Sequence, residues 1–599
     1  MQYVPILEVL KQYLGQEDVW ASMNANFMEV SDPDILAGYK AGAHFQSSEF
    51  YSAHPHALRI VLYTDEFEIV NPLGAKRGQQ KLLAVYYMVE NIEAQYRSTL
   101  SNIHLALLVR NKIAQKYGYE GILKPLITDL KILEKDGIFI NVNGTTHHRL
   151  GSVIAMCGDN LSAHAVGGFS SCFNSGRICR HCMALKPEIC TKFEESQFVL
   201  RTTEVHAYHL NAIKADSHNC SVYGVYRPCV LDELRYFDVT KCLPPDPMHD
   251  LLEGVVHHVI RVVLKELLTQ RCLNFSSSKL QKKMEEFKYG SNDAMSKPVV
   301  IQAKNVKHNE PNIVGSASQK LCLFRLLPFL IGEFVPEDAD IWELYLSCRE
   351  IVDICLSPIV KKSWLPYLQQ EVIDLSELFA KYSQDQYPCK LHYLIHYHRH
   401  LSDFGPLRNF WCMRFESKHQ YFKNLSSVVR NFRNVALTLT TRHQSLQCWQ
   451  MNAGSFFQQQ ESALSNCRQI SVLKLPRALQ RVLTEMSLVH EGNLWKTNSV
   501  QVNSMTYQDD DVIIIDIKHE EIPVFGKVKH ILQCDTHWYI CIKEFDTCRF
   551  NRHLHAYEIG VTERWSVMKA GPRRDFQSLS LYEIDDKCMV SLKHRPLLL

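Results

Sequence analysis

Runs of apolar residues predict β-strands near the start of the chain. Residues 58–70, 81–92 and 101–109 are apolar, rich in Val, Ile and Tyr, and separated by turn residues. Residues 118–137 instead carry Ile and Leu at helical spacing up to a glycine, and 149–159 return to a strand pattern. The predicted order is three strands, a helix and a fourth strand, which matches the ribonuclease H-like fold.

Helical spacing dominates from about residue 170 to residue 390. Asp246 followed by Pro247 is typical of a helix N-cap and first turn. One long apolar stripe follows it, formed by Leu251, Leu252, Val255, Val259, Val263 and Leu267. Further helical patterns cover 317–335 and 340–383. We therefore expect a mainly helical block here.

A basic helix and a group of short strands complete the pattern. Phe415, Lys418, Phe422, Leu425, Val429 and Phe432 fall on one helix face. Beyond residue 508, the segments 509–517, 522–532, 537–545 and 553–559 alternate as strands do. These strands predict a small C-terminal β domain that serves binding or packing.

Composition favours a folded protein of several domains. The chain has 599 residues, of which 46% are apolar, and its 20 cysteines suit a reducing compartment better than a disulfide scaffold. The N-terminus lacks the pattern of a signal peptide. The most apolar long window contains Arg325 and Glu333, which argues against a membrane span. We expect a soluble intracellular protein.

Positive charge is concentrated in one segment. The net charge is only +2, but residues 391–445 hold eight Lys and Arg against two acids. A phosphate backbone would bind most readily here, and the alternative is a solvated helix face. The candidate contacts are Arg414, Lys418, Lys423, Arg430 and Arg433, with Trp411 either stacking on a base or belonging to the core.

Two of the predicted strands deliver an aspartate. Asp65 follows the first apolar run, before the turn residues 71–74, and Asp159 ends the fourth. Carboxylates brought side by side repel each other unless a divalent cation lies between them. Glu416, at the start of the basic helix, is the candidate third ligand. The alternatives are a turn cap or surface charge for Asp65, and for Glu416 a simple complement to the helix dipole.

Cysteines and histidines suggest a second metal site. Cys179 and Cys182 form a C-x2-C pair, and His206 and His209 follow, a donor set that suits tetrahedral zinc. Cys172, Cys190 and Cys220 are alternative ligands that could replace any of the four. Ordinary buried thiols are the alternative.

Several motifs together resemble one protein family. "YTDEFEIVNPLG", "CGDNLSAHAVGGF", "CRHC", "DPMHDLLEGV" and "RFESKHQYFKNL" are similar to successive motif blocks of CACTA/EnSpm-like DDE/D transposases, a family with many animal transposon-derived proteins. The resemblance covers about residues 45–450.

The resemblance implies an α/β fold in which a large helical insertion interrupts a ribonuclease H-like mixed-sheet core, and the strand pattern adds the small all-β domain after it. The expected segments are 1–55 (helical or irregular), 56–170 (first core part), 171–400 (insertion with the Cys/His cluster), 401–500 (last core part) and 505–599 (β domain).

The resemblance also implies an activity. Asp65, Asp159 and Glu416 would hold two Mg²⁺ or Mn²⁺ ions for DNA strand cleavage and transfer. Asp246 and His249 match a D/C-x2-H motif in which the histidine lies near the transferred DNA. The implied partners are transposon ends and target DNA, in a nuclear homo-oligomer that needs no membrane.

One departure keeps other functions open. Such transposases recognise transposon ends with an additional module, often a zinc finger ahead of the core, and here no cysteine precedes Cys157. A domesticated, inactive DNA- or chromatin-binding protein is therefore the main alternative. A nuclease that acts without transposon ends is the third.

Overall fold

The computed structural model describes most of the chain. The described residues are 1–25, 32–70, 78, 80–97, 99–270, 273–430, 432–457, 461–488, 493–502, 505–518, 521–573 and 575–597, so the predicted turn at 71–74 falls outside them. The protein is a mixed α/β structure that divides into two compact units. Unit 1 comprises Met1–Asp250, Lys361–Leu365 and Cys389–Gln458, and unit 2 comprises Leu251–Val360, Pro366–Pro388 and Gln459–Leu599. The segment predicted as one helical insertion, 171–400, contributes to both units.

A five-stranded mixed sheet forms the centre of unit 1. Its order is β1 (Gln2–Tyr3), β5 (His104–Arg110), β4 (Lys81–Val89), β3 (Leu58–Glu68) and β8 (Gly151–Cys157). The β3–β8 pair is parallel, and the other pairs are antiparallel. All four strands predicted in this region are present. Asp65 lies inside β3 and not at its end, because pairing with β4 continues as far as Glu68.

The predicted helix and its flanks differ from the sequence pattern. Helix α6 (Asn111–Lys135) begins earlier than expected, with a kink at Gly118, whose φ of 65° is available to glycine. A hairpin of β6 (Ile138–Val142) and β7 (Thr145–Arg149) then precedes β8. Its second strand is polar and largely exposed, so apolar periodicity did not predict it.

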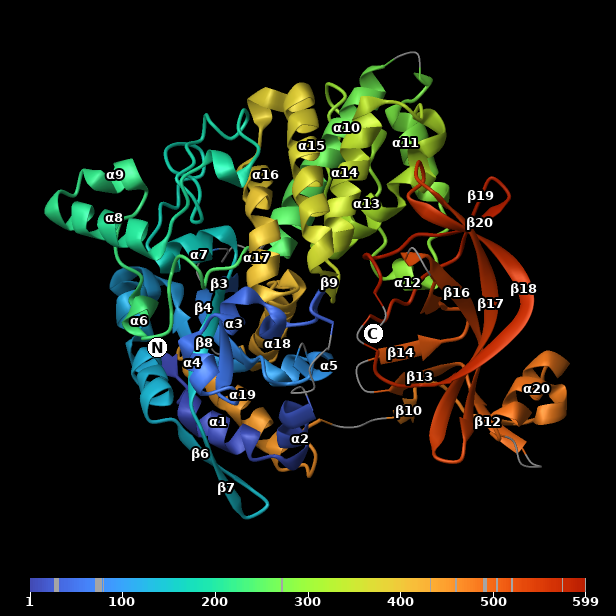
Figure 1. Ribbon diagram of the computed structural model, residues 1–599, viewed down its shortest axis with the longest axis horizontal. Coiled ribbons are helices and arrows are strands. Elements are labelled where there is room, and N and C mark those ends of the chain that lie inside the picture. The colour runs from blue at the N-terminus through green and yellow to red at the C-terminus, as the bar shows by residue number, and fades with distance from the viewer. Residues whose placement is uncertain are drawn as a thin grey trace. The chain divides into compact units, whose positions relative to one another are not determined.

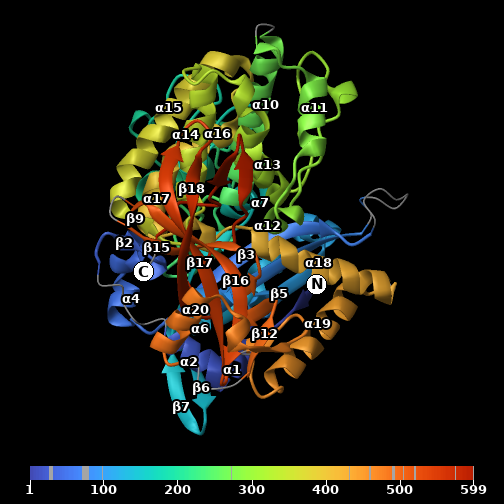
Figure 2. The same ribbon diagram turned by 90° about the vertical axis from the view of Figure 1, so that its right-hand side faces the viewer.

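The two faces of the sheet bury different partners. On β3, Leu58, Ile60 and Leu62 join the core cluster that includes α6. The alternate residues point the other way, as strand geometry requires. Tyr63 stacks on Phe415 of α18 (Met413–Val429), with ring centroids 4.6 Å apart. Figure 2 shows α18 beside α19 (Val435–Met451), which contacts β5.

Unit 2 combines helices with a large antiparallel sheet. The helices include α10 (Val256–Thr269), α13 (Ala317–Ile331), α14 (Asp340–Cys355) and α15 (Leu365–Ser383). The long strands β16 (Pro523–Cys534), β17 (His537–Asn551) and β18 (Ala556–Lys569) curve together in Figure 1. Their sheet also takes in β11 (Arg468–Ser471) and β12 (Asn493–Thr497), so it begins upstream of the predicted boundary at 505.

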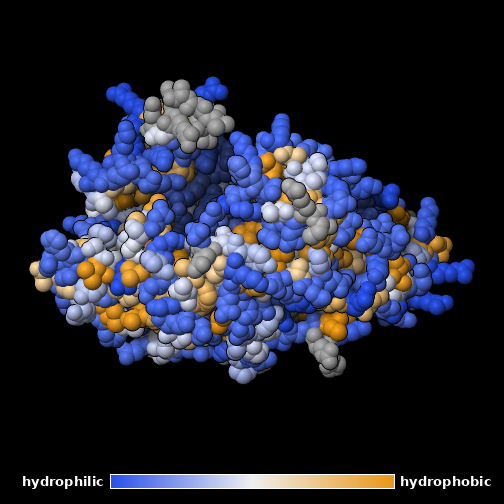
Figure 3. All heavy atoms as spheres, turned by 90° about the horizontal axis from the view of Figure 1, so that it is seen from above, coloured by the Kyte–Doolittle hydropathy of each residue, from blue (hydrophilic) through white to orange (hydrophobic). Residues whose placement is uncertain are grey.

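Hydrophilic residues dominate the visible surface, and the described cysteines form no disulfide. On the face that Figure 3 shows, hydrophobic residues form small separate groups among hydrophilic ones. None of the helices in the described ranges has both the length and the apolar content that crossing a bilayer requires. The cysteines described by the structure, from Cys157 to Cys588, are free thiols.

Candidate functional site

The parallel strand pair places two aspartates at corresponding positions. Tyr63 of β3 is paired with Cys157 of β8, and Asp65 and Asp159 each lie two residues further along. Adjacent strands run about 5 Å apart. Asp159 is also the N-cap of α7 (Asn160–Gly167), where its Oδ1 accepts a hydrogen bond of 2.6 Å from Ser162 N–H. The parallel pairing therefore sets both aspartates at the same level of the sheet, Asp65 within β3 and Asp159 two residues beyond the end of β8.

Helix α18 meets Asp65 through a histidine. His419 Nε2 lies 3.2 Å from Asp65 Oδ2, and its Nδ1 lies 3.0 Å from the hydroxyl of Tyr86. Tyr63 donates a further hydrogen bond of 3.2 Å to Asp65 Oδ2. His419 is buried and stacks on Phe67, with centroids 4.4 Å apart. These contacts fix the direction of the Asp65 side chain. His419 falls within the motif "RFESKHQYFKNL", but the sequence alone did not single it out as a site residue.

Glu416 lies on the same helix and contacts the D-x2-H motif. Its Oε1 is 3.3 Å from His249 Nε2, and the opposite ring nitrogen of His249 is 2.6 Å from Asp246 Oδ2. His249 lies in a π-helical segment, η5 (Met248–Val255), a wide turn that is frequent at functional sites. The predicted cap is present, because Asp246 accepts hydrogen bonds from the N–H groups of Met248 and His249.

Asp246 joins the two segments. Its Oδ1 accepts the N–H of Cys412, immediately before α18, at 3.0 Å. Burial alone would lower the pKa of His249, but the hydrogen bond and charge of Asp246, together with the charges of Glu416 and Asp159, raise it to about 9. An imidazolium at neutral pH therefore sits between two carboxylates. Burial raises the pKa of Tyr63, and the charges of Asp65 and Glu416 raise it further.

The three predicted acids do not form a compact metal-binding group among the described residues. Within the described ranges, donor atoms that all lie within 4.8 Å of one another form two groups, and Asp65, Asp159 and Glu416 are not one of them. Their oxygen donors suit Mg²⁺. In this geometry, however, the positive group beside Glu416 is the ring of His249.

A compact buried cluster of two cysteines and two histidines is the clearer candidate metal site. Cys179 and Cys182 meet His392, on α16 (Cys389–Tyr393), and His396, on η11 (Leu394–His396). The Sγ–Nε2 distances are 3.5 Å for Cys179–His396 and 3.2 Å for Cys182–His392. Tetrahedral zinc with ordinary bond lengths separates sulfur and nitrogen ligands by about 3.5 Å, so the residues fit zinc.

Hydrogen bonds around this cluster would suit a bound metal ion. Glu195 Oε1 lies 2.5 Å from His396 Nδ1, which would orient the ring as carboxylates do for metal-bound histidines. The N–H of His181 donates to Cys179 Sγ at 3.3 Å. Although burial opposes it, the neighbouring Cys182 and the two histidines hold the pKa of Cys179 well below its usual range.

The histidines are not those that the spacing had indicated. His206 and His209 lie on α8 (Thr203–Ala215), where His206 packs near Phe169 and His209 stacks on Tyr223 with centroids 4.3 Å apart. Burial lowers the pKa of each to about 4. His206 and His209 are buried core residues. The histidines that meet the cysteines come instead from α16 and η11. The sequence "HYLIH" at 392–396 did carry a usable pattern, H-x3-H at helical spacing.

The cysteine loop also supports the acid-bearing edge. Arg180 lies between the two cysteines, and its Nη1 donates to Asn160 Oδ1 at 2.7 Å. Other atoms of its guanidinium reach the carbonyls of Leu243 and Pro244. Asn160 directly follows Asp159. A metal that orders this loop would therefore also order the start of α7.

The predicted nucleic-acid contacts separate into two groups. Arg414, Arg430 and Arg433 are exposed and Lys423 is partly so. Lys418 is buried instead, with Nζ donating to the carbonyl of Leu100 at 2.7 Å, because it falls on the apolar face of α18. Burial lowers its pKa to about 7. Lys418 is therefore not placed to contact a phosphate.

Trp411 is half-buried, so its burial does not decide between stacking on a base and packing in the core. The guanidinium of Arg408 lies over its ring at 5.4 Å from the centroid.

No protein-family model matches this chain, and a search of curated proteins returns no match for it.

Proposed function

We propose that unit 1 is a ribonuclease H-like nucleic-acid enzyme of the DDE/D transposase type. The observation that carries the proposal is the parallel β3–β8 pair, which sets Asp65 and Asp159 at corresponding positions next to the helix that bears Glu416. An edge of this kind, with a third carboxylate on a facing helix, suits phosphodiester chemistry.

The residues of the chain would divide the work. Asp65, Asp159 and Glu416 would bind two Mg²⁺ ions, which when bound activate the attacking oxygen and stabilise the leaving one. His249, as an imidazolium hydrogen-bonded to Asp246, would offer a proton and a positive charge next to the scissile phosphate. Tyr63 and His419 would keep Asp65 pointed at the metal.

DNA is the proposed substrate. The exposed residues Arg414, Arg430 and Arg433, with Lys423, lie on or just beyond α18, the helix that carries Glu416. They would bind the phosphate backbone and supply a salt-dependent part of the affinity. Nuclear location and a homo-oligomer that pairs two DNA ends belong to the same proposal.

A specific observation favours a second candidate. The three acids do not form a compact metal-binding group in the described structure, and His249 already supplies positive charge to Glu416. A domesticated DNA- or chromatin-binding protein, which keeps the fold but no longer cuts, would have this property.

Cleavage assays separate the candidates. Purified protein is incubated with Mg²⁺ and with DNA that carries any inverted repeats found beside its gene, or with unrelated DNA. A transposase nicks at the repeat ends, and Asp65→Asn reduces the rate at least 1,000-fold while Glu8→Gln, an exposed carboxylate of unit 1, has no effect. Cleavage without end preference would indicate a nuclease. Binding without cleavage would support the domesticated protein and contradict our proposal.

A further inference from the structure

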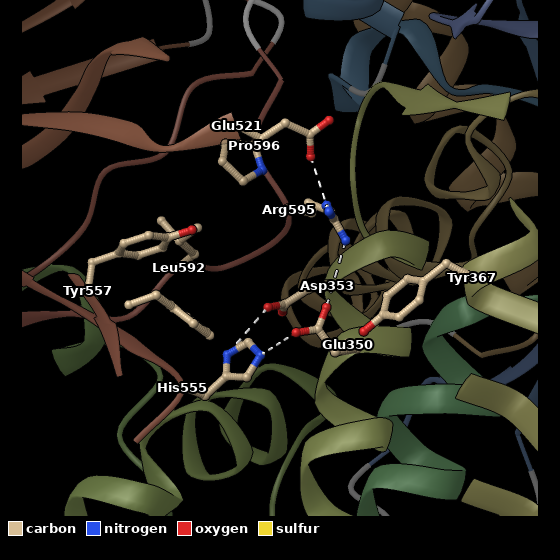
Figure 4. A pocket seen from close by; sticks show the side chains of 10 residues that line it. Glu350, Asp353, Tyr367, Glu521, His555, Tyr557, Leu592, Arg595 and Pro596 are labelled. Atoms are coloured by element: carbon tan, nitrogen blue, oxygen red, sulfur yellow. Dashed lines mark hydrogen bonds and ion pairs between the residues drawn. The ribbon is translucent and has the colours of Figure 1, made fainter. Parts of the chain in front are cut away.

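Unit 2 contains a cavity that the proposed DNA chemistry does not use. Its volume is about 320 Å³, and its wall includes Glu350 and Asp353 of α14, Glu521 before β16, and Arg595 near the C-terminus. Small-molecule and side-chain sites begin at about this size. Figure 4 shows acidic, basic and aromatic side chains converging on the same space.

Three carboxylates give the cavity its chemical character. Asp353 forms an ion pair with Arg349, whose Nε lies 2.8 Å from Asp353 Oδ1. Glu350 Oε1 lies 3.1 Å from His555 Nε2, and its other oxygen lies 3.8 Å from Arg595 Nη1. Although burial opposes it, His555 and Arg595 hold the pKa of Glu350 below its usual range. Glu350 therefore faces the cavity as an anion.

Arg595 occupies part of this acidic space. Its Nη2 lies 3.1 Å from Glu521 Oε2, and its guanidinium lies over the ring of Tyr367 at 5.9 Å. The 3.8 Å separation from Glu350 is too long for a hydrogen bond. The Arg595 side chain is 30% exposed and that of Glu521 is 29% exposed, so solvent reaches this ion pair.

The backbone of Arg595 is held independently of its side chain. Its N–H donates to the carbonyl of Asp353 at 2.9 Å, and its carbonyl accepts the hydroxyl of Ser357. The side chain can therefore leave Glu521 without moving the tail.

Aromatic residues border the acidic groups. Tyr367 and Phe550 both line the cavity, and they are 41% and 40% exposed. Phe550 packs against Tyr557, with centroids 5.0 Å apart. Exposed rings next to carboxylates favour a flat organic cation, because both ring faces and carboxylates attract positive charge.

Two residues that line the cavity have strained backbones. Glu521 has a φ of 61° and His555 a φ of 47°, in the left-handed region that side chains other than glycine rarely adopt. Such conformations persist where the surrounding structure imposes them, and they cluster at ligand sites. Here both direct a charged or titratable side chain into the cavity.

We propose that this cavity binds an arginine side chain of a partner protein, and that Arg595 is an internal ligand which the partner's arginine displaces. The guanidinium would form a two-point contact with Glu521 and Glu350 and stack between the exposed rings. Arginine fits better than lysine, because a planar fork matches two separate carboxylates.

Titrations with capped amino acids test the proposal on the full-length protein. N-acetyl-arginine amide, its lysine analogue and the neutral isostere N-acetyl-citrulline amide are followed by saturation-transfer NMR. Arg595→Ala is expected to tighten binding of the arginine probe at least tenfold, and adding Glu521→Gln to that variant to weaken it at least tenfold. The citrulline probe is expected to bind neither the wild-type protein nor the Arg595→Ala variant.

A matched variant isolates the cavity. Arg549→Ala removes an exposed arginine of the same unit that pairs with Glu558, and it is expected to leave binding at the wild-type level. Equal affinity of wild type and Arg595→Ala, or equal binding of citrulline and arginine, would overturn the proposal. Tighter binding of lysine than of arginine would overturn the choice of ligand.

Discussion

In unit 1, contacts with neighbouring side chains fix the orientation of the Asp65 carboxylate. Asp65 is held by the hydroxyl of Tyr63 and the ring of His419, and His419 is in turn held by Tyr86. A carboxylate with two fixed partners keeps one orientation, which lowers the cost of binding a metal.

His419 is therefore expected to act as a positioning residue. His419→Phe keeps the ring that stacks on Phe67 but removes the contact to Asp65. We expect the Mg²⁺ concentration for half-maximal cleavage to rise at least tenfold. Tyr86→Phe, which removes only the outer contact, is expected to change it less than threefold. Equal Mg²⁺ dependence of wild type and His419→Phe, measured in cleavage assays, would contradict this role.

Buried neutral histidines make unit 1 sensitive to acid. His104 of β5 is fully buried, and burial, with a smaller contribution from Lys418, lowers its pKa to about 3. The unfolded chain takes up a proton below about pH 6.5, whereas the folded chain does not. Stability is therefore full above pH 6.5 and is lost as the pH falls toward 3. By pH 4 the loss from this residue is up to about 3 kcal/mol.

His104→Phe is expected to remove most of this dependence. The variant keeps an aromatic ring against Tyr87, while Gln447 loses its partner at 2.8 Å. Hydrogen exchange of β5 amides at pH 7 and pH 4 measures the effect. The variant is expected to be less stable at pH 7 but to lose less stability on acidification. An unchanged difference between the two pH values would show that His104 is not the titrating group.

At the scale of elements, a metal would connect the cysteine loop to α16 and η11. Four donors from two distant segments are buried together. We expect one zinc per chain, lost in Cys179→Ser and in His396→Gln. His206→Gln and His209→Gln, which change the histidines predicted from spacing, are expected to keep it. Metal analysis of the purified variants tests this ligand set. Zinc retained in His396→Gln would contradict it.

Helix α18 carries exposed basic residues on one side and packs its other side into the core. Arg430→Gln removes an exposed charge at the end of the helix, and Lys418→Met a buried one. In DNA titrations at several salt concentrations, Arg430→Gln is expected to lower the salt dependence by about one charge. Lys418→Met is expected to leave it unchanged. A smaller salt dependence in Lys418→Met would mean that this side chain reaches DNA after all.

At the scale of the whole molecule, unit 2 depends on the last described residues of the chain. The buried side chain of Arg325 donates to the carbonyl of Ser591 at 3.0 Å, and that of Arg349 donates to the carbonyl of Leu592. Removing these acceptors would leave two buried guanidinium groups short of partners. Truncation after Val590 is therefore expected to lower the free energy of unfolding of unit 2 by at least about 3 kcal/mol.

Truncation after Leu597 keeps all of these contacts and serves as the control. Hydrogen exchange in β16, β17 and β18 reports on unit 2 in both proteins. Equal protection in the two truncated proteins would show that the tail does not support this unit.

The sequence by itself determined the elements whose pattern is local. The four strands that include β3 and β8, the apolar stripe from Leu251 to Leu267 and the buried face of α18 follow from side-chain period, because one buried face imposes a regular spacing. It also indicated Asp65, Asp159 and Glu416 as acids near one edge, and Cys179 with Cys182 as a donor pair.

Tertiary structure alone decided which distant residues meet. It paired the cysteines with His392 and His396 instead of His206 and His209, set His249 between Asp246 and Glu416, and placed His419 on Asp65. It also enclosed the cavity around Arg595. Spacing along a chain carries no information about such contacts, because they depend on how separate helices and strands pack against one another.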